Sequence, residues 1–382
     1  MYRKLYRIVL AFGIILLAGC GKTEQAGDTE TEETEQIKEN DSKTVMTFPE
    51  QYKDEIEKVA FDMEIIIDTD IQENAPVTAK ANLQKADWQK AFDFLYGDVK
   101  DYETYEYVEK NEYGEEAKMG IYMNPDGLNF SYGSYSSHIS YTNAEITPYV
   151  YASFVLDKTD SAYNADLYSC ETQLSFKSRE DAFSLVEQVL TEMGIRMDME
   201  YHGYALDYQT MQEQEWHMGM DGERDDESYK PDWSEADDCY YFAINQMYRG
   251  LPMYHPFSGV FTKADDSTAP VMALVSNDGI QHIEVERVFE MTEEQEGVQL
   301  CSIENIASVI ANKYNQILGD SKYEILKARL YYYVDINSGL GTYDMKPVWI
   351  ITGLEKAQDT EQAIQIIIDA QTAEEIYLDE LF

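Results

Sequence analysis

Apolar residues recur at regular intervals along the chain from residue 61 onward. In residues 61–67 apolar and polar positions alternate, which predicts a strand because successive strand side chains point to opposite faces. Residues 88–95 place their apolar side chains at helical spacing and are followed by Gly97, so they predict a short helix. Residues 100–156 are rich in tyrosine and strand-like, with a turn predicted at the Asn-Pro-Asp-Gly sequence of 124–127.

Two longer helices have the clearest signals in the chain. The first is predicted to begin after Ser178, a good N-cap residue, and to end at Gly194. The second is predicted to begin after Ser302 and to end at Gly319. Their apolar faces consist of Ala182, Leu185, Val186, Val189, Leu190 and Met193 in the first helix and of Ile306, Val309, Ile310, Tyr314 and Ile317 in the second.

Short alternating or fully apolar runs predict the remaining strands, at 170–176, 240–247, 272–275, 283–289, 326–334, 348–351 and 364–368. The five alternate residues from Leu326 to Val334 are expected to share one face, and 348–351 is apolar on both faces, as in a central strand. Strands connected through short turns and interrupted by single helices are typical of an α+β fold. We therefore expect antiparallel sheets, each packed against a helix.

The N-terminus has the pattern of an export signal. Three basic residues precede the apolar run 8–17, which is shorter than the ~20 residues that span a bilayer. The sequence Leu-Ala-Gly-Cys at 17–20 resembles the lipobox of bacterial lipoproteins. That resemblance implies removal of residues 1–19 and acylation of Cys20, which anchors the protein to the extracytoplasmic face of the cell membrane. An uncleaved N-terminal anchor is the alternative.

Composition divides the rest of the chain. Residues 20–48 are polar, acidic and without an apolar period, which predicts a disordered tether. We expect an N-terminal α+β domain at 49–212, an acidic linker or surface loop at 213–238, and a C-terminal α+β domain at 239–382.

The formal net charge is −44, and it becomes −47 when the three basic residues of 1–19 are removed. This charge argues against nucleic acid as a partner. It favours a basic protein surface, and Asp225, Asp226 and Glu227 in the acidic segment are the candidate contact residues. A solvated loop with no binding role is the alternative for these three residues.

No catalytic, cofactor or metal-binding motif is present in the sequence. His202 and His217 flank a stretch with Asp207, Glu213 and Glu215, where a metal or acid–base site is one alternative and solvated surface the other. The acids of 221–227 do not follow the spacing of a calcium-binding loop. We assign no catalytic, cofactor or metal residue.

Three cysteines remain after lipidation, namely Cys170, Cys239 and Cys301. They allow one disulfide at most. Cys170 is predicted to be a small core residue on a strand face, and no disulfide is assigned.

The last third of the chain resembles the PepSY-like modules found in membrane-tethered regulators of a cell-wall sensor kinase (the YycH and YycI type) and in clostridial lipoproteins. The motifs, in order, are Tyr241-Phe242, Gln246, Gly250-Leu251-Pro252, Asp278-Gly279-Ile280, Lys346-Pro347-Val348-Trp349 and Ile368-Asp369-Ala370-Gln371-Thr372. The final motif has Ala373 where those modules usually have glycine. The resemblance implies two PepSY-like or cystatin-like units and a regulatory role, and it supplies no catalytic residue.

These patterns favour a membrane-anchored, non-enzymatic lipoprotein that binds a protein partner in the cell envelope. One alternative is a lipoprotein that binds a small molecule, sugar or peptide on its tyrosine-rich face. Another is a hydrolase without a familiar motif.

Replacing the lipidation residue tests the predicted anchor. We expect Cys20→Ala to abolish labelling by a fatty-acid probe and to release the protein from the membrane fraction, because the thioether that holds the acyl chains cannot form. A variant that still labels and still sediments with membranes would contradict lipidation at Cys20.

Overall fold

The structure, a computed structural model, describes residues 47–110, 116–134, 137–156, 162–218, 225, 227–255, 269–336, 338, 341–357 and 360–377. The signal peptide and nearly all of the tether predicted for 1–48 lie outside these residues. In the described part the fold is mixed α/β, with mostly antiparallel strands and five α-helices. The helices are α1 (Trp88–Leu95), α2 (Thr147–Ser153), α3 (Arg179–Glu192), α4 (Tyr208–Gln214) and α5 (Ile303–Gln316), with short 3₁₀ helices η1 (Ala165–Leu167) and η2 (Glu235–Asp237).

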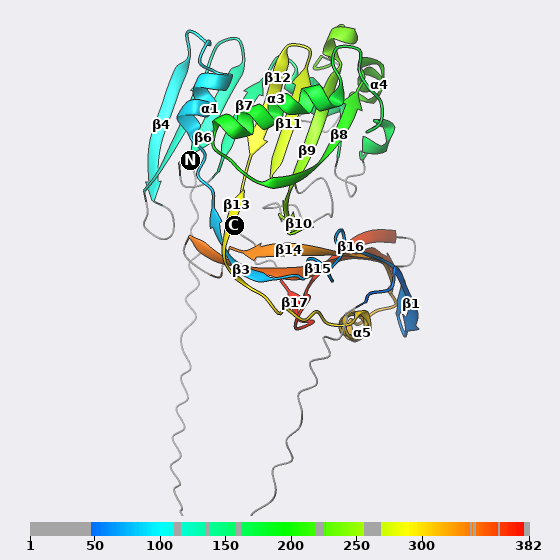
Figure 1. The fold of residues 1–382 in the computed structure, drawn as a ribbon. Coiled ribbons are helices and arrows are strands. Elements are labelled where there is room, and N and C mark those ends of the chain that lie inside the picture. The colour runs from blue at the N-terminus through cyan, green and yellow to red at the C-terminus, as the bar shows by residue number, and fades with distance from the viewer. Residues whose placement is uncertain are drawn as a thin grey trace, which may run out of the picture. The chain divides into compact units, whose positions relative to one another are not determined.

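Eight strands form one antiparallel sheet, here called the α3 sheet, with the order β4-β5-β6-β7-β12-β11-β9-β8. Helix α3 lies across one face of it (Figure 1). The strands are β4 (Glu103–Lys110), β5 (Glu116–Met123), β6 (Leu128–Gly133), β7 (Ile139–Asn143), β8 (Asp198–Leu206), β9 (Cys239–Tyr248), β11 (Val271–Ser276) and β12 (Gly279–Val285).

The helix α3 begins and ends as its sequence predicts. The Ser178 hydroxyl accepts a hydrogen bond from the Asp181 backbone N–H at 3.1 Å, which satisfies one of the free donors at the helix start. Gly194 follows the helix with φ of 78°, a conformation that favours glycine. Its buried residues, including Val186 and Leu190, pack with α1 and strand residues into one core. Helices α2 and α4 contribute to a second core with Tyr241 and neighbouring residues on the opposite side of β9.

The other strands form the α5 sheet, whose centre is the antiparallel pair β14 and β15. On one side of β14 lie β2 and β10, both parallel to it, and on the far side of β15 lie β3 and β16. Strands β1, β13 and β17 extend β2, β3 and β16. The strands are β1 (Gln51–Ile56), β2 (Val59–Ile66), β3 (Thr78–Leu83), β10 (Leu251–Tyr254), β13 (Phe289–Gln295), β14 (Lys322–Asp335), β15 (Thr342–Ala357), β16 (Thr360–Asp369) and β17 (Glu375–Ile376).

The α3 sheet is an insertion within the α5 sheet. The chain leaves the α5 sheet after β3 and returns to it in β13, the antiparallel partner of β3. All strands of the α3 sheet come from the residues between, and only β10 reaches from that segment into the α5 sheet, where it pairs with β14. The predicted boundary at 213–238 therefore does not separate the two sheets. Strands from 49–212 and from 239–382 pair with one another in both.

A pair of glutamine side chains holds the point where the chain crosses between the sheets. The buried Gln246 amide donates to the Phe289 carbonyl at 2.6 Å and accepts from the Phe289 N–H at 3.0 Å. The Gln84 amide donates to the carbonyl oxygens of Arg196 at 2.6 Å and Phe289 at 3.1 Å. Leaving a buried polar group unpaired costs about 1–3 kcal/mol, so the two buried bonds of Gln246 strongly favour this path of the chain between the sheets.

Four strand predictions need correction. The predicted strand 283–289 is divided between β12 and β13, and the strand-like stretch 100–156 includes helix α2. Residues 170–176 form no strand. The Leu174 N–H instead donates a hydrogen bond to the Tyr240 hydroxyl at 2.6 Å. In β14, Leu326 is exposed although the other four residues of its predicted face are buried. A β-bulge between Ile325 and Lys327 inserts one extra residue there, which turns Leu326 outward and places Ile325 in the core.

The three cysteines among the described residues, Cys170, Cys239 and Cys301, are free thiols. Cys239 is fully buried, whereas Cys170 and Cys301 are half-buried. Among the described residues, no helix has the length and apolar character needed to cross a membrane.

The last motif of the predicted resemblance forms a tight turn after β16. The Asp369 carboxylate accepts hydrogen bonds from the backbone N–H groups of Gln371 at 2.9 Å and Thr372 at 3.1 Å, and it pairs with the Lys346 ammonium at 2.9 Å. Burial opposes ionisation of Asp369, but these partners outweigh it and hold the pKa of its carboxyl group below the usual range. Ala373 closes the turn in the left-handed region, with φ of 58°.

Replacing Ala373 by glycine should stabilise the fold. The left-handed conformation costs an alanine about 1–2 kcal/mol, whereas glycine adds only about 0.5–1 kcal/mol of unfolded-state entropy. We expect Ala373→Gly to raise the free energy of unfolding by about 0.5–1 kcal/mol in denaturant titrations. Ala370→Gly is the matched control, since Ala370 is buried and does not have positive φ, and it should destabilise. Equal losses in both variants would contradict the strain at Ala373.

Candidate functional site

The acidic segment that sequence analysis singled out is only partly described. The Asp225 carboxylate accepts hydrogen bonds from the Ser228 hydroxyl at 2.6 Å and from the Glu227 N–H at 3.1 Å, and these bonds lower its pKa. Glu227 is exposed, and Asp226 lies outside the described residues. Asp225 thus shapes a local turn, while Glu227 is open to solvent.

The predicted histidine and carboxylate cluster is not assembled as one site. The buried Glu215 carboxylate accepts hydrogen bonds from His217 Nε2 at 2.9 Å, from the Lys230 N–H at 2.8 Å and from Trp233 Nε1 at 2.8 Å. Asp207 instead caps α4 by accepting a hydrogen bond from the Thr210 N–H at 2.9 Å. His202 lies on β8, and Glu213 is exposed on α4. Glu215 and His217 therefore anchor the acidic segment to the fold.

The tyrosine-rich strands build an aromatic core under α1. Trp88 stacks on Tyr132 with ring centroids 3.9 Å apart, and Phe92 contacts Tyr122 and Phe130. Gly120 leaves room for this stack, because a Cβ atom there would lie 2.1 Å from the Tyr132 ring. Tyr132 and Tyr141 are buried, so they cover a sheet face from inside and form no exposed aromatic patch.

Strand β4 is the outermost strand of the α3 sheet and is exposed on both faces. In the described residues it pairs with β5 alone, in an unbroken antiparallel register of eight pairs. Tyr105 and Tyr107 are 51% and 41% exposed on one face, and Val108 is 55% exposed on the other. Figure 1 shows β4 at the edge of the sheet with no strand or helix drawn beyond it. Its outer backbone groups are consequently available to another extended chain.

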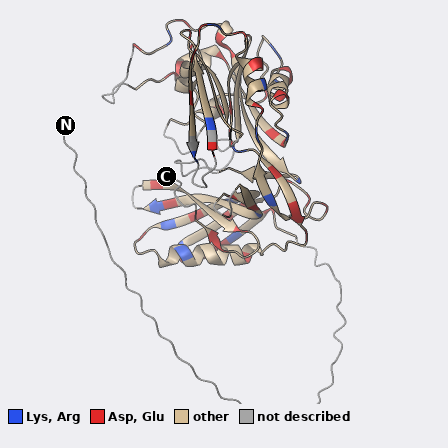
Figure 2. Cartoon of the chain, turned by 90° about the vertical axis from the view of Figure 1, so that its left-hand side faces the viewer, with Lys and Arg blue, Asp and Glu red and all other residues tan. Residues whose placement is uncertain are grey.

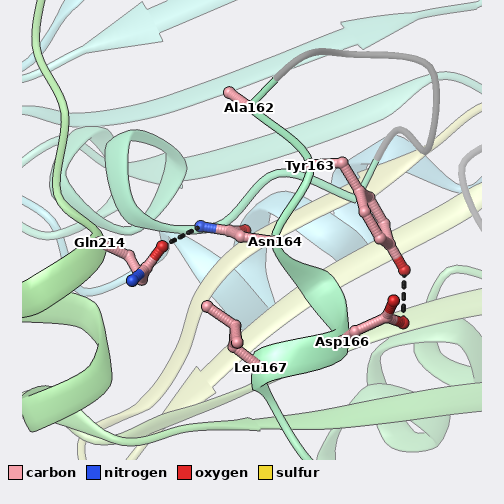
Figure 3. Close-up of a pocket in the computed structure, with 6 residues that line it drawn as sticks. All are labelled: Ala162, Tyr163, Asn164, Asp166, Leu167 and Gln214. Atoms are coloured by element: carbon pink, nitrogen blue, oxygen red, sulfur yellow. Dashed lines mark hydrogen bonds between the residues drawn. The ribbon is translucent and has the colours of Figure 1, made fainter.

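A shallow hollow of about 400 Å³ lies beside η1. Its polar groups mostly satisfy one another (Figure 3). The Tyr163 hydroxyl donates to Asp166 at 2.7 Å, and the Asn164 amide donates to the Ser153 carbonyl at 2.8 Å and faces Gln214 at 3.5 Å. Such internally paired groups hold the backbone in place and leave little to orient a ligand.

One group of residues in the described chain has the composition of a metal site, and sequence analysis missed it. His138, Glu284 and Glu286 each place one ligand atom within 4.8 Å of the others. His138 Nδ1 lies 2.9 Å from a Glu286 carboxylate oxygen. The only sequence signal was the alternation of His282, Glu284 and Glu286 along a predicted strand. Their partner His138 is more than 140 residues away in the sequence.

Burial and charge shift the pKa values in this group. The hydrogen bond with Glu286 raises the pKa of His138. Burial and the neighbouring Glu286 raise the pKa of Glu284. Burial would also raise the pKa of Glu286, but the hydrogen bond to His138 outweighs it and the pKa is lowered.

Comparison with solved structures supports the fold and does not identify a function. A crystal structure of an uncharacterised protein from Eubacterium rectale ATCC 33656 has a TM-score of 0.57 with 16% sequence identity, covering 87% of this chain and 94% of that one. The C-terminal domain of YpeB from Bacillus megaterium gives a TM-score of 0.29 with 9% identity, covering 77% of this chain and 96% of that domain, which is too low to support a shared fold. No protein-family model and no curated protein matches the chain. The first similarity shows a shared mixed α/β architecture.

Proposed function

We propose that this chain is an extracytoplasmic lipoprotein, held at the cell membrane by acylated Cys20, that binds an extended segment of an envelope protein along the free edge of β4. In this proposal the protein performs no catalysis and acts by binding to its partner. The exposed β4 edge is the observation that carries the proposal. The lipobox-like sequence at 17–20 supports the location.

The edge of β4 differs from the protected edges of most soluble sheets. Natural edge strands are usually blunted by proline, by bulges, by very short length or by charged side chains, and of these devices β4 has only the charged side chains. Strand β4 has eight residues, no proline and no bulge, and it presents Tyr105, Tyr107 and Val108 to solvent. An added strand would gain main-chain hydrogen bonds from the edge, and alternate side chains would contact the two tyrosines on one face and Val108 on the other.

Charge indicates a basic partner segment. Strand β4 contains Glu103 and Glu106, which are tied to the hydroxyl groups of Tyr105 at 2.7 Å and Tyr122 at 3.0 Å. Acidic residues are scattered over both sheets and their helices (Figure 2). With a net charge of −44, the whole chain attracts basic chains and repels nucleic acid. Lysine or arginine residues in the partner would meet Glu103 and Glu106 beside the aromatic contacts.

A PepSY-like character and a regulatory role belong to the same proposal. They rest on the order of short motifs in 240–382 and on the lack of a catalytic motif in the sequence. The Asp369 turn supplies a structural reason for the last motif, because its carboxylate holds two backbone N–H groups in the turn. Binding of a small molecule, sugar or peptide has less support, because the polar groups of the hollow beside η1 are mostly paired with one another.

Site-specific photo-crosslinking in living cells tests the β4 edge. We expect a photoreactive amino acid at Val108 to give one discrete protein adduct, because this exposed residue lies beside the proposed added strand. The same amino acid at Tyr377, which is 72% exposed and directly follows β17 of the α5 sheet, is the matched control and should give none. Adding Tyr105→Ser and Tyr107→Ser to the Val108 reporter should lower adduct yield at least tenfold, about 1.4 kcal/mol of binding.

A third reporter position separates β4 from the acidic segment. A photoreactive residue at exposed Glu227 tests the patch predicted from sequence. Adducts from Glu227 and none from Val108 would move the binding site to the acidic segment. Equal adducts from Val108 and Tyr377 would contradict a specific site on β4. Saturable turnover of a model substrate, lost on changing one carboxylate or histidine, would contradict the non-enzymatic proposal.

A further inference from the structure

A row of polar side chains crosses two neighbouring strands of the α3 sheet. Strands β7 and β12 are antiparallel, and Thr142 pairs with His282 and Ser140 with Glu284. Alternate residues of a strand share a face, so His282, Glu284 and Glu286 follow one another on the same side. The register ends with Ile139 opposite Val285, which brings His138 beside Glu286 at the end of the row.

The backbone on both sides of this end is fixed. The buried Ser137 hydroxyl donates to the Glu286 carbonyl and accepts a hydrogen bond from the Val288 N–H at 2.8 Å. The Glu286 N–H donates to the Pro270 carbonyl at 2.8 Å. His138 and Glu286 are therefore held next to each other by the strands and by Ser137, and they do not depend on a mobile loop.

The carboxylates in this row form no ion pair with a lysine or arginine of the described residues. Their ion-pair partners are histidines, and the charge of Arg287 acts on Glu286 without an ion pair. Two carboxylates side by side repel each other unless one is protonated or a cation lies between them. A bound cation would therefore relieve the repulsion between Glu284 and Glu286.

His282 is the second observation that indicates a ligand. It is 5% exposed, and its Nδ1 lies 2.9 Å from the Thr142 hydroxyl, which fixes the ring. Its other nitrogen, Nε2, is buried and has no hydrogen-bond partner in the structure. It lies 4.0 Å from a Glu284 carboxylate oxygen, too far for a hydrogen bond. A ring oriented through one nitrogen and open at the other is the usual arrangement of a metal-binding histidine.

We propose that His138, Glu284 and Glu286 bind a divalent transition-metal ion, with His282, whose Nε2 lies 4.0 Å from the Glu284 carboxylate, as an outer partner that positions Glu284. Imidazole nitrogen together with carboxylate oxygen suits zinc and related ions. Zinc takes these ligands at about 2.0–2.2 Å, so ligand atoms already within 4.8 Å of each other need only a small rotamer adjustment. Calcium requires six to eight oxygen ligands, which this row does not supply. The ligand-bearing side chains of His138 and Glu286 are 26% and 37% exposed, which leaves an entry path for the ion.

Zinc binding to the purified full chain, measured by calorimetry after dialysis against a chelator, tests the site. We expect one saturable zinc equivalent per chain. Glu284→Gln and Glu286→Gln should each weaken binding at least tenfold. Glu290→Gln on β13 is the control, since Glu290 is exposed and the substitution removes the same charge from the surface. It should leave the affinity unchanged.

Two further measurements make the result decisive. Thr142→Val keeps all proposed ligands and should weaken zinc binding about tenfold, as loss of an orienting partner does. Unchanged binding in this variant would overturn the role of His282. Thermal unfolding without metal checks that each variant is folded. Absence of a saturable zinc equivalent, equal weakening in Glu284→Gln and Glu290→Gln, or displacement of zinc by an equal concentration of calcium would overturn the site.

Discussion

The hydrogen bonds between Gln246 and the backbone of Phe289 hold the two halves of this architecture together. Gln246 lies on β9, which pairs with the outer strand β8 of the α3 sheet, and Phe289 begins β13, with which the chain returns to the α5 sheet. Both bonds are buried. Leaving either the Gln246 amide or the Phe289 backbone groups unpaired would therefore lower the free energy of unfolding by about 1–3 kcal/mol. Because β13 must also pair with β3, this contact fixes where an inserted sheet begins and ends. The β4 edge and the His138 row both belong to that inserted sheet.

Local elements could be predicted from the sequence, because their signals are local. The caps at Ser178 and Ser302 and the glycines at 127 and 194 appear in the structure at the predicted positions. Strand pairing could not be predicted in the same way. The parallel pairing of β2 with β14 joins residues more than 250 positions apart, and no composition shift marks the crossings near Gln84 and Val288. An acidic, broken segment at 213–238 suggested a boundary, yet the strands before and after it, β8 and β9, pair with each other in the inserted sheet.

The candidate sites likewise divide into features that local sequence signals predict and features that depend on strand pairing. Sequence reasoning found the exposed charge of the acidic segment but not the β4 edge, because an edge exists only after the sheet order is known. It likewise found single histidines but no metal ligands, since His138 meets Glu286 only through the register of β7 and β12. The bulge after Ile325 is a further example, because one inserted residue reverses the face of Leu326 without a sequence signal.

The central claim, that one sheet is inserted within the other, is tested most directly by thermal unfolding of two fragments under the same conditions, followed by circular dichroism. Fragment 86–288 contains the whole α3 sheet with its helices and should unfold cooperatively. Fragment 239–382 matches the division suggested by composition but lacks β2 and β3, which removes one of the strands that pair with β14 and one of those that pair with β15. The account predicts that it has no cooperative transition. Cooperative unfolding of 239–382 together with an unfolded 86–288 would contradict the account.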